Sequence, residues 1–79
     1  MNVIVNGKSY KAVKTDECDD KYLEYDVFNG KERIGNITRY DAEIVYSIWN
    51  NNGRLVGMHK ELREAVKTIA YKYITPVIY

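Results

Sequence analysis

Apolar and polar residues alternate in short segments along the first 58 residues of this 79-residue chain. In residues 21–28, for example, Leu23, Tyr25 and Val27 alternate with more polar neighbours. A period of two residues is typical of a strand that buries one face. The pattern predicts an antiparallel sheet of five to six strands, at residues 2–5, 8–14, 21–28, 31–39, 42–49 and 54–58.

Three Asn-Gly pairs separate strand-like segments and predict tight hairpins. They are Asn6-Gly7, Asn29-Gly30 and Asn52-Gly53. A two-residue turn of type I′ needs positive φ at both central residues, which asparagine and glycine tolerate best. The first two pairs fill two-residue gaps between predicted strands, and the third lies in a turn predicted at residues 50–53.

Two strand-like segments depart from simple alternation. A bulge near Gly35 is needed to place Ile34 and Ile37 on the same face, because these isoleucines are three residues apart. In residues 42–49 apolar side chains occur on both sides, with Ile44 on the same side as the later isoleucine. Two apolar sides favour a central strand for this segment.

Residues 60–73 predict one amphipathic helix. Apolar residues recur there at spacings of three, four and seven: Leu62, Ala65, Val66, Ile69, Ala70 and Tyr73. Pro76 disfavours helical geometry in the residue before it, so the helix should end near residue 73. The tail, residues 75–79, is expected to pack beside the helix, to pair as an extra strand or to reach a partner chain.

These elements together predict a single α+β domain over residues 1–79. An antiparallel sheet of hairpins occupies about residues 2–58, and the C-terminal amphipathic helix packs on one sheet face. A composition of 46% apolar and 29% charged residues is typical of a folded chain. A domain of this size buries only roughly 60–65% of the surface of its unfolded chain, so its core is thin.

The cysteine count and the lengths of the apolar runs favour a location in the cytoplasm. Cys18 is the only cysteine, so an internal disulfide is excluded and a reducing environment is favoured. The longest apolar runs fall far short of the roughly 20 residues of a membrane span, and no secretion signal opens the chain. We therefore predict a cytoplasmic protein without a membrane partner.

Residues that commonly perform catalysis are scarce in this chain. His59 is the only histidine, whereas most acid–base and nucleophilic schemes need a histidine or a paired base. Carboxylates on both sides of Cys18 oppose formation of the thiolate. The acidic segment that starts at Asp16 lacks the glycine and glutamate of a calcium-binding loop. We predict no enzymatic activity, no cofactor and no metal site.

Tyrosine content and charge segregation favour protein binding. Eight tyrosines suit a sheet or an interface that is half buried and half wet. Residues 16–26 carry six acidic residues and one lysine, and separated charges of this kind steer docking. The predicted partner-binding residues are Asp19, Asp20, Tyr22, Glu24, Asp26 and Tyr79. A homodimer is a further way to cover leftover apolar strand surface.

Nucleic-acid binding is the alternative function. An aromatic sheet face stacks bases in several single-strand binders, while basic side chains contact phosphates. The candidate phosphate contacts are Lys8, Lys11, Lys14, Arg33 and Arg39. The formal net charge of +1 is well below the basic balance of most dedicated nucleic-acid domains, which favours the protein partner.

Residues 53–69, GRLVGMHKELREAVKTI, resemble the ending of many small phage and prophage proteins. In those proteins a short strand with a glycine precedes a helix that contains a Glu-Ala pair. The resemblance implies an accessory protein of a virus or mobile element that docks on a host protein and modulates it. It supplies no site motif, so no residue is assigned a function from it.

Overall fold

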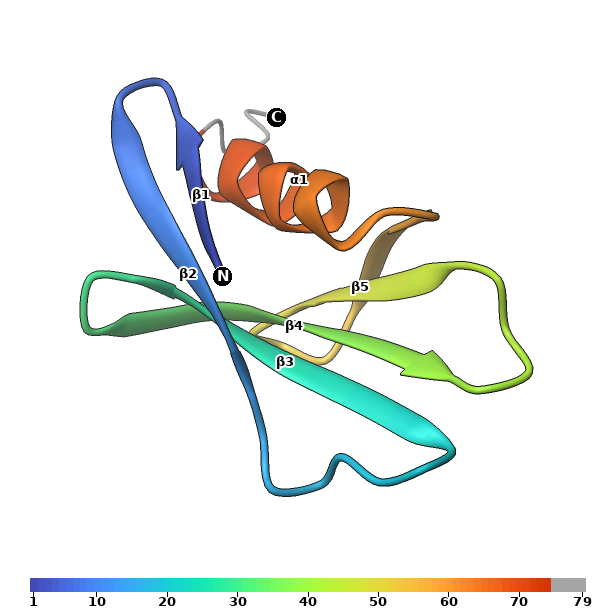
Figure 1. Cartoon of the computed structure of the whole chain (residues 1–79). Helices are drawn as coiled ribbons and strands as arrows, with labels where there is room; N and C mark the ends of the chain where they lie inside the picture. The colour runs from blue at the N-terminus through green and yellow to red at the C-terminus, as the bar shows by residue number, and fades with distance from the viewer. Residues whose placement is uncertain (75–79) are drawn as a thin grey trace.

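The computed structural model describes residues 1–74, which form one six-stranded antiparallel sheet and one helix (Figure 1). Each strand pairs with its neighbours in sequence, so the strand order is β1-β2-β3-β4-β5-β6. The elements are β1 Asn2–Val5, β2 Lys8–Lys14, β3 Tyr22–Asn29, β4 Glu32–Tyr40, β5 Tyr46–Asn50, β6 Leu55–His59 and α1 Leu62–Ile74. The α+β class and the antiparallel sheet of hairpins are confirmed, whereas the tail at residues 75–79 lies outside the described residues.

The buried core combines residues of the sheet with residues of α1. Figure 1 shows the helix on one side of the curled sheet, and α1 contacts β1, β2, β4, β5 and β6. The helix contributes small and branched side chains to this core, and the strands contribute mainly branched ones. The core residues are Val3, Val5, Tyr10, Ala12, Val27, Ile34, Ile37, Ile48, Ala65, Val66, Ile69 and Ala70.

The bulge predicted near Gly35 is present in β4. Val27 of β3 pairs with Gly35, while the next residue of β3 pairs with Arg33, so Ile34 is the extra residue. Ile34 and Ile37 are consequently both buried, as the prediction required. Gly35 allows close packing here, because an added Cβ would lie 2.8 Å from a backbone oxygen of β5.

The first Asn-Gly pair forms the expected two-residue turn. Val5 pairs with Lys8, and the two residues between them, Asn6 and Gly7, have φ of 51° and 79°. Positive φ at both central positions is the property of a type I′ turn. This hairpin is therefore determined by residues adjacent in sequence.

The second Asn-Gly pair is shifted by one residue from its predicted position. Asn29 still belongs to β3 and pairs with Glu32, so the central residues are Gly30 and Lys31. Gly30 has a φ of 63°, whereas Asn29 is absent from the residues with positive φ. Pairing across the bulge sets this register, and the asparagine becomes the last strand residue.

The third Asn-Gly pair lies in the turn predicted at residues 50–53, which is longer than a two-residue hairpin turn. The backbone N–H of Asn50 donates to the carbonyl of Arg54, which leaves three residues in the loop. Only Gly53 has positive φ, at 76°. The side chain of Asn50 accepts hydrogen bonds from the N–H groups of Asn52 and Arg54, and these bonds stabilise the longer turn.

The strand predicted at residues 42–49 is shorter than expected. β5 begins at Tyr46, and Ile44 is 76% exposed instead of facing the core with Ile48. The preceding residues form a turn in which the Glu43 carboxylate accepts a hydrogen bond from the backbone N–H of Tyr40. The central position is confirmed, because β5 pairs with both β4 and β6.

The helix begins two residues later than predicted. β6 extends to His59, and the Nδ1 atom of this residue accepts a hydrogen bond from the backbone N–H of Glu61. Glu61 in turn provides the carbonyl that accepts the hydrogen bond of Ala65, so α1 starts at Leu62. The strand and the helix are therefore joined by a two-residue connection.

Candidate functional site

The sheet face opposite the buried core carries most of the distinctive side chains of this protein. We call it the open face and define it by three rows of paired strand residues. The rows are Val13–Asp26–Asn36–Trp49–Leu55, Glu24–Thr38–Ser47–Met58 and Tyr22–Tyr40. Alternation along each strand directs these side chains away from the face of Val27, Ile37 and Ile48.

A groove of about 400 Å³ crosses the open face. β3, β4 and β5 each contribute to its lining, and the turn after β5 closes one end. The lining includes Tyr22, Glu24, Asn36, Thr38, Tyr40 and Trp49. The groove therefore combines three large rings with several hydrogen-bonding groups.

The aromatic side chains of the groove are held in place by the sheet. Tyr22 and Tyr40 are paired across β3 and β4, and their ring centroids are 4.9 Å apart at an angle of 48°. The indole Nε1 of Trp49 donates to the Oγ1 of Thr38 over 2.9 Å, which sets the orientation of that ring. Tyr40 is nonetheless 60% exposed, so its ring is accessible to a partner.

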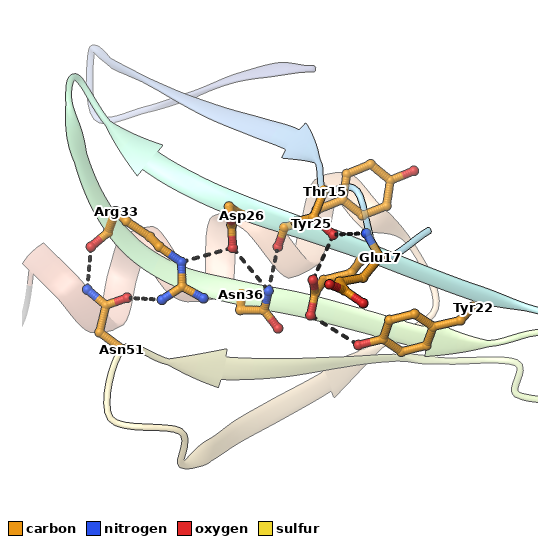
Figure 2. A network of polar contacts seen from close by, with 9 residues as sticks. Thr15, Glu17, Tyr22, Tyr25, Asp26, Arg33, Asn36 and Asn51 are labelled. Atoms are coloured by element: carbon orange, nitrogen blue, oxygen red, sulfur yellow. Dashed lines mark hydrogen bonds and ion pairs between the residues drawn. The ribbon is translucent and has the colours of Figure 1, made fainter. Parts of the chain in front are cut away.

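Glu24 contributes a half-buried carboxylate at the groove. One carboxylate oxygen accepts from the Thr15 hydroxyl over 2.7 Å, and the other accepts from the Tyr22 hydroxyl over 3.1 Å (Figure 2). Within residues 1–74, no cationic side chain forms an ion pair with this carboxylate. Two hydroxyl groups, instead of an ion-pair partner, therefore stabilise the negative charge of Glu24.

The electrostatic environment of Tyr22 reflects this neighbour. Burial, together with the hydrogen bond to Glu24 and its negative charge, raises the pKa of the Tyr22 phenol to about 12. Burial is the largest of these causes. It raises the pKa because removal from water disfavours the ionised phenolate. Tyr22 therefore remains a neutral hydrogen-bond donor over the whole physiological range.

The second acidic residue of β3 is neutralised. The carboxylate of Asp26 pairs with Arg33, with 2.9 Å between Oδ1 and Nε, and it also accepts a hydrogen bond from Asn36. Arg33 extends the network to Asn51 (Figure 2). The amide oxygen of Asn51 accepts a hydrogen bond from the Arg33 guanidinium, and its amide nitrogen donates one to the Arg33 carbonyl. The ion pair leaves this end of the groove close to electrically neutral.

The acidic loop between β2 and β3 folds back onto the start of β3. The Cys18 sulfur both donates to the Glu24 carbonyl and accepts from the Glu24 N–H, at 3.3 Å each. Asp19 pairs its backbone N–H with the Tyr22 carbonyl over 2.9 Å. These contacts place exposed Asp19 and Asp20 beside Tyr22, around a hollow of about 120 Å³.

The predicted partner-binding residues are therefore largely brought together. Tyr22, Glu24 and Asp26 lie on the open face, and the two loop aspartates, Asp19 and Asp20, border it. Tyr79 lies outside the described residues.

The five basic residues of the nucleic-acid alternative are divided between the two faces. Alternation puts Lys11 and Arg33 on the same side of the sheet as the open face, whereas Lys8 and Lys14 share the side of the buried residues of β2. Arg39 also lies on the core side, with its guanidinium carbon 5.2 Å from the centroid of a β5 tyrosine ring. No single surface of the described chain presents all five.

Trp49, Thr38 and Tyr40 were not predicted as site residues. They lie on β4 and β5, whereas the sheet residues predicted to bind a protein partner are all on β3. The position of Trp49 on the opposite side of its strand from Ile48 is a sequence signal for a large aromatic side chain on the second sheet face. The pairing that brings Trp49 to Thr38 is not visible in local sequence.

In an alkaline titration, the phenol of Tyr22 should ionise at a higher pH than an ordinary tyrosine. The folded pKa lies above the usual value of 10.0, so the stability contributed by neutral Tyr22 is complete below pH 10 and is lost as the pH rises towards 12. NMR of ¹³Cζ-labelled tyrosine should show a resonance with a midpoint near pH 12 that Tyr22→Phe removes. Glu24→Gln should lower that midpoint, and an unchanged midpoint would exclude the carboxylate as a cause.

The comparisons with known proteins do not extend these observations. No family model, no curated protein and no solved structure matches the chain. Within the described residues, no helix is long and apolar enough to cross a membrane, and no group of three or more acidic, histidine or cysteine residues is arranged to hold a metal ion.

Proposed function

We propose that this protein is a non-enzymatic binding protein that docks on another protein through its open face. The observation that carries the proposal is the groove in which the rings of Tyr22, Tyr40 and Trp49 lie beside hydrogen-bonding groups. Tyrosine and tryptophan are the residues most enriched at the energetic centres of protein interfaces. The polar network around the rings supplies donors and acceptors for a partner.

The proposal includes an amphipathic α1 that packs its apolar side on the opposite sheet face. Four helix residues, Ala65, Val66, Ile69 and Ala70, are buried, and the methyl groups of Ile69 approach Gly35 closely. A helix in that position stabilises the sheet from one side only. The open face is then the side on which a partner has access to the strands.

We further propose that the partner is a host protein and that the chain acts in the cytoplasm as an accessory protein of a phage or mobile element. Residues 53–69 span the end of a turn, β6 and the first part of α1. In the small phage and prophage proteins that this segment resembles, a short strand with a glycine also precedes a helix. Modulation of the host protein would follow from occupying its surface, since the proposed chemistry is binding alone.

Tyr40→Ala should weaken capture of the partner at least tenfold. The substitution removes an exposed ring from the groove, and truncation of an interface hot spot costs about 2 kcal/mol or more. Tyr71→Ala is the matched control, because Tyr71 is 52% exposed and lies on α1. The measurement is affinity capture from a nuclease-treated bacterial lysate with the three proteins, read by quantitative mass spectrometry.

The proposal is supported by one stoichiometric protein that the wild type and Tyr71→Ala retain and that Tyr40→Ala loses at least tenfold. Equal capture by Tyr40→Ala would remove the open face from the proposed function. Light scattering of the purified protein identifies the remaining case, in which the retained protein is a second copy of this chain.

A nucleic-acid partner is the second candidate, because one register row places Phe28 between Lys11 and Arg33. A half-buried ring flanked by two cations is suited to a base and its phosphates. Arg33 is already paired with Asp26, which weakens its availability. Loss of every captured partner after nuclease treatment, with affinity that falls steeply with salt, would favour this candidate over the protein.

A further inference from the structure

The charge of the groove points to the chemical class of its occupant. Asp26 is neutralised by Arg33, whereas Glu24 has no ion-pair partner within residues 1–74. The groove therefore retains a net negative charge at the carboxylate of Glu24. The hollow beside the same end of the groove is lined by Asp19, Asp20 and Asp41 and by two cations, Lys21 and Arg39, so its small formal charge is also negative.

A half-buried carboxylate is an effective site for a cation. Partial removal from water strengthens its attraction for a positive charge, while the Thr15 and Tyr22 hydroxyls hold its two oxygens in fixed positions. The preorganised geometry lowers the entropic cost of binding. An anionic ligand at the same position would be repelled.

The aromatic rings beside Glu24 favour an organic cation. Lysine and arginine side chains bind over the faces of tyrosine and tryptophan rings, an interaction worth about 0.5–2 kcal/mol. The planes of the Tyr22 and Tyr40 rings form an angle of 48°, so the two rings are not stacked face to face. The same chemistry occurs within this protein on the core side, where Arg39 lies 5.2 Å from the ring centroid of Tyr46.

We propose that the groove binds a lysine or arginine side chain presented by the protein partner. The cationic group would contact the Glu24 carboxylate and lie against the rings of Tyr22 and Tyr40, with Trp49 along the aliphatic stem. The inference rests on the proposed docking function and identifies its partner as a protein with an exposed basic segment. Charge complementarity is the reason to place a basic protein here.

The test uses two acetylated and amidated hexapeptides, (Gly-Arg)₃ and (Gly-citrulline)₃, which differ in charge but hardly in shape. Trp49 is the only tryptophan of the chain, so its fluorescence and its indole N–H resonance report binding at the groove. The arginine peptide should produce a saturable change, and the citrulline peptide should bind at least tenfold more weakly. Equal binding of the two peptides, or no change with either, would overturn the cation assignment.

Glu24→Gln provides the second arm of the test. The substitution keeps one acceptor oxygen but removes the negative charge, so the affinity for the arginine peptide should fall at least tenfold. Glu61→Gln, a change of the same kind at an exposed position before α1, should leave the affinity unchanged. Thermal melts of both variants show whether the fold is retained, and undiminished binding by folded Glu24→Gln would contradict the proposal.

The outcomes separate this inference from the proposed function. If neither peptide binds but Tyr40→Ala still loses the captured protein, docking through the open face stands and the cation assignment fails. If Tyr40→Ala retains the captured protein, the docking function fails on this face. A change in Trp49 fluorescence with a single-stranded oligonucleotide, but not with the arginine peptide, would overturn the assignment in favour of nucleic acid.

Discussion

Ile48→Ala should lower the free energy of unfolding by about 2–5 kcal/mol, the usual cost of truncating a fully buried isoleucine. Ile48 is 0% exposed and lies at the centre of the core, between Ile37 of β4 and Gly57 of β6. The loss combines the transfer of the deleted methyl groups with the cavity that they leave. Urea denaturation at low temperature, followed by circular dichroism, is the appropriate measurement.

The control is Ile44→Ala, the same chemical change four residues earlier. Ile44 is 76% exposed, so its truncation should change the free energy of unfolding by less than about 0.5 kcal/mol. If Ile48→Ala fails to fold, Ile48→Val provides a smaller deletion with an expected cost of about 0.5–1.5 kcal/mol. Equal costs for Ile44→Ala and Ile48→Ala would contradict the position at which β5 begins.

Gly35→Ala should lower the free energy of unfolding by about 1–3 kcal/mol, because the site has no room for a methyl group. The added Cβ would lie 2.8 Å from the Trp49 carbonyl oxygen and 3.0 Å and 3.1 Å from two carbons of Ile69. The backbone oxygen cannot move without breaking the pairing of β4 with β5. A loss of 1 kcal/mol corresponds to a fall in melting temperature of about 4–8 °C for a domain of this size.

Gly57→Ala is the matched control for this prediction. Its Cβ would meet only side-chain atoms, at 3.6 Å from Thr68 and 3.7 Å from Ile48, which is ordinary van der Waals contact. We expect a melting temperature within a few degrees of the wild type, since the change also restricts the unfolded chain by about 0.4–1 kcal/mol. Differential scanning calorimetry of both variants decides the matter, and similar melting temperatures would exclude the steric explanation.

Gly35 also connects the core to the candidate site. Its backbone lies against Ile69 of α1 on one side, while Asn36, the next residue, belongs to the groove. A shift of β4 to accommodate a methyl group would move the strand that carries Thr38 and Tyr40. We therefore expect any folded fraction of Gly35→Ala to bind the partner less tightly than Gly57→Ala does.

Features that depend on neighbouring residues are determined by the sequence alone. The turn at Asn6-Gly7 follows from the conformational preferences of those two residues. The alternation of Tyr22, Glu24 and Asp26 in β3 places all three on one face whichever strands lie beside it. For this reason the antiparallel sheet and the C-terminal helix were predicted correctly, and the common face of these three β3 residues followed from the sequence.

The bulge at Ile34 was also predictable from residues close to it in sequence. Two isoleucines three residues apart cannot both face a core without an extra residue in the strand, and the adjacent glycine marks the place. The prediction required only the assumption that both isoleucines are buried.

Features that depend on pairing between distant residues were decided by the tertiary structure. The register across the bulge moved the second turn to Gly30 and Lys31, and hydrogen bonds of Glu43 and Asn50 set the start and end of β5. The other half of the groove, Thr38, Tyr40 and Trp49, reaches Glu24 only because β3, β4 and β5 are adjacent. Local sequence determines which face a side chain occupies, whereas its neighbours on that face are determined by strand pairing and register.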